Sequence, residues 1–176
     1  MKKTIFTMLA IAMMAGVSNN AMAQNSAMAN SEVIATVIAP ISINMGATLS
    51  FGNIIKGNGT VTVKPIGGKE SSYNAFTITQ DGADANGTFK VSGEKGYTYS
   101  IVLPVNDFVV LRDSDSNSMA VSDFTCISIG SPSENLIGTL SSKGGDTLMV
   151  GATITVTDSQ APGSYSAIYM VTVSYN

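Results

Sequence analysis

Histidine and tryptophan are absent from the 176-residue sequence, and Cys126 is its single cysteine. Without histidine, the chain has no imidazole base for a serine or cysteine nucleophile and no histidine ligand for a metal. A single thiol cannot form a disulfide within the chain, so the core has to supply the stability. Because Cys126 lies beside Phe124 and Ile127, we expect it to pack as a small apolar side chain.

Charged residues are also scarce, at 12% of the sequence, which is about half the usual fraction. Nine basic residues face 12 acidic ones, and the net charge of −3 disfavours nucleic acid and anionic membranes as partners. The acidic residues lie in or beside turn-like stretches, so solubility explains them better than a catalytic carboxylate pair does. We therefore expect no enzyme and no cofactor.

Two acidic stretches carry oxygen ligands at a spacing that calcium could use. They are Asp113, Asp115 and Asn117 in the first stretch, and Asp81, Asp84 and Asn86 in the second. The first stretch lacks the glycine of an EF-hand loop and has Phe124 where that loop needs a bidentate glutamate. A looser calcium site stays open as an alternative, but polar connections between strands are the interpretation that the sequence favours.

The segment Met1–Ala23 has the layout of a secretory signal peptide. Two lysines precede an apolar run, Ile5 to Val17, that is too short to span a bilayer, and Ala21 to Ala23 form a small-x-small triplet. Cleavage after Ala23 would leave 153 of the 176 residues, which suits one domain. A retained N-terminal anchor is the alternative. We expect a short arm at 24–31 and a β-sandwich domain at 32–176.

Period-two alternation between turn residues predicts an all-β chain. The stretch Val33 to Ile43 is almost continuously apolar and predicts an edge strand that breaks or switches sheets near Pro40. Further strands are expected in GTVTVKP from Gly59, NAFTITQ from Asn74, GTFKVSG from Gly87, YTYSIVLP from Tyr97, DFVVLR from Asp107, FTCISI from Phe124, TLMVGATITV from Thr147 and the segment from Gly163. This number of short strands indicates an immunoglobulin-like antiparallel β-sandwich, which is either complete or lacks one strand.

The segment Gly163 to Asn176 alternates without interruption. One face carries Tyr165, Ala167, Tyr169, Val171, Val173 and Tyr175, and the opposite face includes Ile168 and Met170. Apolar residues on both faces predict cover from both sides. We therefore expect this strand to lie in the middle of its sheet, or to become central when a partner binds.

The same segment resembles the C-terminal pattern of chaperone-usher pilins: a glycine fourteen residues from the end, alternating apolar positions and a penultimate tyrosine. Val150 to Asn176 also resembles the end of spore coat U-like secreted proteins. Over its length the chain is similar to a domain-of-unknown-function family of secreted bacterial proteins. The matching blocks are ATVIAPISI from Ala35, LSFGNI from Leu49, GTVTV from Gly59 and the C-terminal block.

The resemblance implies a fimbrial or surface-structure subunit that assembles by β-strand complementation, in the periplasm or on the surface of a Gram-negative bacterium. The partner strand would come from a periplasmic chaperone or from another subunit. Its groove would involve Gly163, where the backbone turns into the strand, then Tyr165, Tyr169, Val171, Val173 and Tyr175, and Asn176, whose terminal carboxylate would face the chaperone.

Pilins also have a donor arm of alternating apolar residues. The candidates here are Ala27, Ala29, Val33, Ala35 and Val37, and the last three would serve only by leaving the domain to which the strand pattern assigns them. The alternative function is a self-complete secreted module of the same fold that binds carbohydrate or acts as a surface adhesin.

Overall fold

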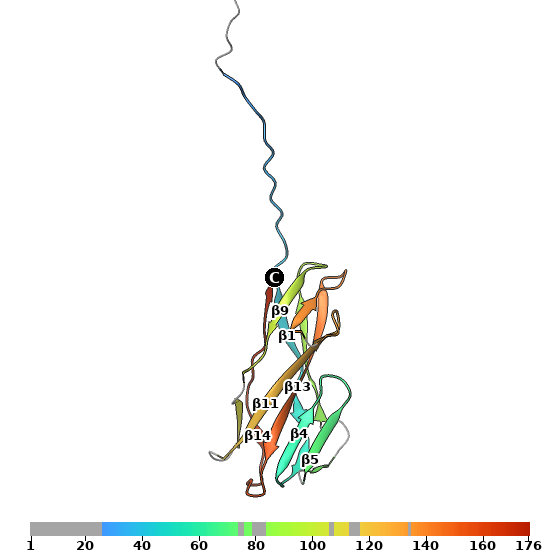
Figure 1. The fold of residues 1–176 in the computed structure, drawn as a ribbon, viewed down its shortest axis with the longest axis vertical. Helices are drawn as coiled ribbons and strands as arrows, with labels where there is room; N and C mark the ends of the chain where they lie inside the picture. Colours follow the sequence, from blue (N-terminus) through green and yellow to red (C-terminus); the bar gives the residue numbers. More distant parts are fainter. Residues whose placement is uncertain (1–25, 74–75, 79–83, 106–107, 113–116, 134) are drawn as a thin grey trace, which may run out of the picture. The chain divides into compact units, whose positions relative to one another are not determined.

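The computed structural model describes residues 26–73, 76–78, 84–105, 108–112, 117–133 and 135–176 (Figure 1). The chain divides into two units, Met1–Thr36 and Val37–Asn176. In the first unit the described residues, from Ser26 on, form no regular secondary structure and are exposed. The predicted signal peptide lies outside the described residues. Within the described part of the chain, no helix has the length and apolar character needed to cross a membrane.

The larger sheet of the second unit is antiparallel and has eight strands in the described part of the chain, in the order β1-β8-β13-β11-β10-β14, with β4 and β5 added beside β13. Because β13 is long, its first half pairs with β8 and its second half with β4. The bounds are β1 Ser42–Ala47, β4 Gly59–Val63, β5 Lys69–Tyr73, β8 Gly87–Ser92, β10 Phe108–Arg112, β11 Ser118–Ser128, β13 Gly145–Val156 and β14 Tyr165–Ser166.

A second sheet has the order β12-β9-β15, with β12 at Ile137–Thr139, β9 at Thr98–Val102 and β15 at Thr172–Tyr175. Two short ribbons complete the described strands: β2 Ser50–Phe51 pairs with β7 Asp84–Ala85, and β3 Asn53–Ile55 pairs with β6 Phe76–Ile78. All of these pairings are antiparallel, so the fold is an all-β antiparallel sandwich, as the sequence predicts.

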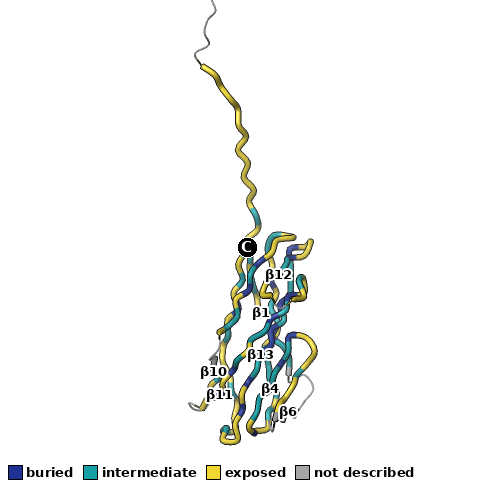
Figure 2. The backbone as a smooth tube through the Cα atoms, in the orientation of Figure 1, coloured by how far each residue is buried: buried dark blue, intermediate teal, exposed yellow. Residues whose placement is uncertain are grey.

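The core lies between the sheets as two adjoining apolar clusters, and its buried positions run along β13 (Figure 2). The first cluster contains Val91, Tyr99, Ile101, Cys126, Leu140, Leu148, Val150 and Val171. The second contains Val61, Met119, Val121, Ala152, Ile154 and Val156. Cys126 is a buried free thiol, which confirms the prediction that it packs as an apolar residue, and burial raises its pKa to about 12.

A carboxylate anchors the polar side of the first cluster. Asp146 Oδ2 accepts hydrogen bonds from the Tyr99 hydroxyl (2.6 Å) and Ser128 Oγ (2.5 Å), while Oδ1 accepts from the backbone N–H groups of Gly130 (2.8 Å) and Thr147 (2.7 Å). Burial, and then the hydrogen bond to Asp146, raise the pKa of Tyr99 far above its usual value. The network therefore fixes a fully buried tyrosine with its hydroxyl satisfied.

The expected strand at Val33 to Ile43 is wrong for most of its length. In the structure β1 begins at Ser42, whose partner is Ser92, the last residue of β8. Residues before Ser42 therefore have no stretch of β8 left to pair with, and local β-propensity does not make a strand without a partner. Pro40 stands ahead of the strand and does not interrupt it.

The closing strand is also less regular than its alternation predicts. Its ends form β14 and β15, but residues 167–171 between them belong to no strand ladder in the described part of the chain. The reason lies in the partners: β14 pairs with β10 of the large sheet, whereas β15 pairs with β9 of the small one. The segment crosses from one sheet to the other.

Candidate functional site

A groove of about 830 Å³ opens between two segments that are more than a hundred residues apart in sequence. One wall comes from Thr48–Lys56, which includes β2 and β3, and the other from Gln160–Tyr169, which includes β14. The floor is the inner face of the large sheet, formed by Val110 of β10, Met119 and Val121 of β11, and Ile154 and Val156 of β13. The groove is therefore apolar at its base.

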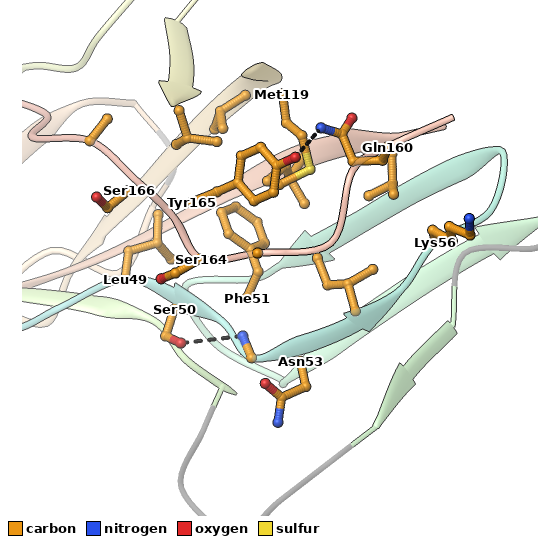
Figure 3. Close-up of a pocket in the computed structure, with 18 of the residues that line it drawn as sticks. Leu49, Ser50, Phe51, Asn53, Lys56, Met119, Gln160, Ser164, Tyr165 and Ser166 are labelled. Carbon is orange, nitrogen blue, oxygen red and sulfur yellow. Dashed lines mark hydrogen bonds between the residues drawn. The ribbon is translucent and has the colours of Figure 1, made fainter. Parts of the chain in front are cut away.

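Aromatic and aliphatic side chains from both walls extend this apolar surface. Leu49, Phe51 and Ile54 pack on the second core cluster from one side, and Tyr165 packs on it from the other. Figure 3 shows the Tyr165 ring between Phe51 and Met119. This apolar lining suits a strand or ligand with apolar side chains, because binding in the groove would remove those side chains from water.

Local hydrogen bonds hold the Tyr165 ring in this position. Its hydroxyl accepts from Gln160 Nε2 (2.7 Å) and donates to the backbone carbonyl of Ala161 (2.7 Å). The loop Gln160 to Ser164 is tied to β10 as well, since Arg112 Nη1 donates to the carbonyl of Pro162 (2.8 Å). The wall is therefore built by interactions within the chain and needs no ligand to form.

Tyr169 closes the groove toward the first core cluster. Its ring meets Phe89 edge-on at 5.8 Å between centroids and Phe124 at 5.6 Å. A Cβ at Gly87 would collide with the Tyr169 hydroxyl, so the glycine makes room for the ring. Burial raises the Tyr169 pKa to about 12.

The backbone beside the groove is the second feature of the site. In the described part of the chain, β14 is an end strand of the large sheet and β15 is an end strand of the small one. The first expectation for this segment, a central place in its sheet, is therefore wrong for the chain alone. Ile168 and Met170 on the outer face are 92% and 79% exposed. The second expectation, that a partner makes the segment central, stays a prediction.

The structure places the predicted groove residues at two different depths. Gly163, Tyr165 and Tyr169 line the groove, and Gly163 has a φ of +156°, a conformation that favours glycine. Val171 belongs to the first core cluster, and Val173 and Tyr175 of β15 pack against it. Asn176 bonds to Thr98 through its backbone N–H (3.3 Å) and its side-chain amide (3.2 Å).

Sequence reasoning missed the opposite wall and the floor. The block LSFGNI is part of the family resemblance, but its sequence indicates no role for Leu49, Phe51 or Ile54. The alternation of Leu49 and Phe51 was a usable signal for a strand with one apolar face. Nothing local to that block indicates that it faces Tyr165.

The candidate donor residues lie where the chain forms no strand. Ala27, Ala29, Val33 and Ala35 belong to the first unit, and Val37 is the first residue of the second. The expectation that Val33 and Ala35 are part of the sandwich is therefore wrong, because β1 has no partner before Ser42. Val33 and Val37 are 95% and 96% exposed.

The candidate calcium stretches gain no cluster in the described residues. Asp81, Asp113 and Asp115 lie outside them, and Asp84 is on β7. Asn86 Nδ2 donates to the carbonyl of Pro65 (2.9 Å), and the backbone carbonyl of Asn117 accepts from the N–H of Arg112 (2.8 Å). Among the described residues, no three histidines, cysteines, aspartates or glutamates come together as metal ligands.

Comparison with known families identifies one relationship. A family model described as Domain of unknown function (DUF4402) matches residues 41–175, which includes every strand of the sandwich, and the chain belongs to this family. Comparison with curated proteins and with solved structures gives no match.

Proposed function

We propose that this member of the DUF4402 family is a non-enzymatic subunit of a fimbrial or other surface structure, and that it assembles by accepting a β-strand from another polypeptide. The signal-like segment Met1–Ala23 supports export to the periplasm or cell surface. A subunit of this kind needs an acceptor groove and a donor segment.

The observation that carries the proposal is the apolar groove bordered by a backbone stretch without a ladder. Residues 167–171 lie between two end strands and next to a volume of about 830 Å³. An added strand would form main-chain hydrogen bonds along that stretch, and its alternate side chains would enter the space over Met119 and Val121. Exposed strand edges are the usual templates for such addition.

The exposed arm supplies a chemically suitable donor. Val33, Ala35 and Val37 share one face of an extended segment, and in the structure they form no strand. Burying a valine side chain contributes about 1.5 kcal/mol or more. Two valines therefore offer a useful part of the binding free energy, and the main-chain hydrogen bonds add register and orientation.

The alternative is a self-complete module whose groove holds a small molecule. The groove volume of about 830 Å³ is consistent with this alternative, because it falls in the range of small-molecule sites. The lining is unlike a carbohydrate site, because the floor side chains are aliphatic or thioether groups. An apolar ligand would suit it better.

The oligomeric state of the chain from Gln24 onward separates the two functions. Light scattering after gel filtration should show polymers that grow with protein concentration, and deletion of residues 24–36 should leave a monomer. A mature chain that stays monomeric at every concentration, with amides 167–171 protected from exchange, would exclude strand acceptance and favour the self-complete module.

A further inference from the structure

The point at which the arm leaves the sandwich is held by a set of hydrogen bonds that the proposed function does not explain. Ala39 donates its N–H to Glu94 Oε2 (3.1 Å) and accepts from the Tyr175 hydroxyl at its carbonyl (2.8 Å). The same hydroxyl accepts from the N–H of Glu94 (2.6 Å). Both backbone groups of Ala39 are therefore fixed to the end of β15 and to the turn after β8.

We propose that this Ala39–Glu94–Tyr175 clamp is a positioning device that keeps the arm out of its own groove and commits it to the groove of a second copy of the chain. The inference rests on the proposed function and adds the contacts that direct the arm to another copy of the chain. It predicts an open head-to-tail filament of identical subunits, because the donor and acceptor surfaces differ.

The residue types at the clamp disfavour a turn that would fold the arm back onto its own subunit. An arm that folded back along β1 would need a tight hairpin at Ala39 and Pro40. Two-residue hairpins require a positive φ at the first central residue, and type I′ requires it at both. Proline fixes φ near −65°, and a residue before proline is restricted to extended backbone. Among the described residues, the non-glycine positions with positive φ are Asp123 and Leu136.

The close approach of β1 and β15 also supports an arm that stays out of its own subunit. Cα atoms of β1 and β15 come within 8 Å of each other, although the two strands form no ladder in the described part of the chain. A strand inserted between two others needs about 9.6 Å, twice the usual spacing. An added strand therefore does not fit between β1 and β15 where these two strands approach each other.

The clamp and the groove lie toward opposite ends of the second unit. Figure 1 shows the chain end after β15 at one end and β14 and β4 toward the other. The groove lies by β14, since Tyr165 and Ser166 line it. Ala39 is therefore fixed at the end away from the groove described above, and Val37, only two residues before it, is too close to this anchor to reach that groove in its own subunit. The groove of another copy is the site that remains for it.

Thiol crosslinking distinguishes the two arrangements. Ala35→Cys places a thiol on the exposed arm, and Ala167→Cys places one on the exposed wall of the groove. A short bis-maleimide is added to a mixture of the two single variants, one of them isotopically labelled. Each variant carries one of the two positions, so an arm-to-groove product has to join two copies. The buried Cys126 stays as it is, and the chain without added cysteine is the control.

The double variant, with both cysteines in one chain, then measures the preference. A short linker gives an effective concentration in the millimolar range, so at about 10 µM protein an arm able to reach its own groove would react within its chain about a hundredfold more often. The proposal predicts that products between copies dominate instead. Tyr175→Phe combined with Ala39→Gly and Pro40→Gly should raise the intramolecular product at least tenfold. Tyr97→Phe, a matched loss of a neighbouring hydroxyl, should not change it.

Each possible outcome of the crosslinking experiment bears on a different part of the proposal. A dominant intramolecular product in the unaltered clamp would overturn the inference while leaving strand acceptance intact. Products between copies that are insensitive to the Tyr175, Ala39 and Pro40 changes would remove the clamp's role. The absence of any arm-to-groove product, in chains that melt like the unmodified one, would overturn the proposed function together with the inference.

Discussion

Replacing Val33 and Val37 by aspartate should abolish assembly without touching the fold. These side chains are 95% and 96% exposed in the structure, so their loss removes almost no packing from the subunit itself. Substitutions at such positions change stability by about 0.5 kcal/mol or less. In the assembled state the same side chains would be buried in the groove of another copy, where each valine contributes about 1.5 kcal/mol or more.

The expected effect on assembly follows from these values. Losing both valines removes about 3 kcal/mol, which corresponds to more than about a hundredfold in the dissociation constant. Burial of the aspartates adds a further cost, because a charge in an apolar groove has no partner. Light scattering over a concentration series measures the shift, and a thermal melt of each variant shows that the sandwich is unchanged.

Ile34→Asp with Thr36→Asp is the matched control, since these residues occupy the opposite face of the extended arm. The control should shift the assembly midpoint by about threefold at most, as expected of solvent-facing positions. The reasoning is refuted if the Val33 and Val37 pair assembles at the unmodified concentration. Greater sensitivity of the control pair would contradict the assignment of the inward face.

Three further predictions concern the sandwich itself. Asp146→Asn replaces one acceptor oxygen by an N–H donor, which then faces either the hydroxyls of Tyr99 and Ser128 or the two backbone N–H groups that donate to Asp146. The free energy of unfolding in urea should fall by about 3 kcal/mol, and a loss below about 1 kcal/mol would contradict the network's role. Gly163→Ala forces a side chain into a φ of +156° and should cost about 1 kcal/mol or more in the same assay; an unchanged midpoint would count against that strain. Because the Cys126 pKa is raised from 9.0 to about 12, its contribution to stability is intact below pH 9 and declines as the pH rises toward 12. The thiol should react with maleimide at pH 9 after unfolding, and rapid labelling of the native chain would disprove this.

Strands with an apolar face could be predicted from the sequence because their signal is local. Alternation in GTVTV, GTFKVS and TLMVGATITV repeats every two residues, and those segments became β4, β8 and the greater part of β13. Strands without this alternation gave no such signal. KESSY at β5 carries one aromatic residue at its end, and it is a strand because β4 offers it an edge.

The stretch Val33 to Ile41 failed for the converse reason. Its residues have high β-propensity, but β8 ends at Ser92 and leaves them without a partner. Propensity describes how well a residue fits a sheet that is already there. The same absence of a partner is what makes the segment available as a donor in the proposed function.

One half of the groove could be predicted and the other could not. Tyr165 and Tyr169 stand out in an alternating segment, so their inward direction follows from the period. Leu49 and Phe51 reach the same space because the segments that contain β2 and β14 line opposite walls of the groove, and that depends on the pairing of several strands far apart in sequence. Sequence patterns fix which face is apolar, not which faces meet.

Hydrogen exchange at residues 167–171 tests strand acceptance most directly. The chain from Val37 onward would be compared before and after addition of a saturating peptide that covers residues 27–38. An added strand should slow exchange at alternate amides of 167–171 by at least tenfold, because those N–H groups would then donate into a new ladder. Unchanged exchange rates at these five residues would contradict the account.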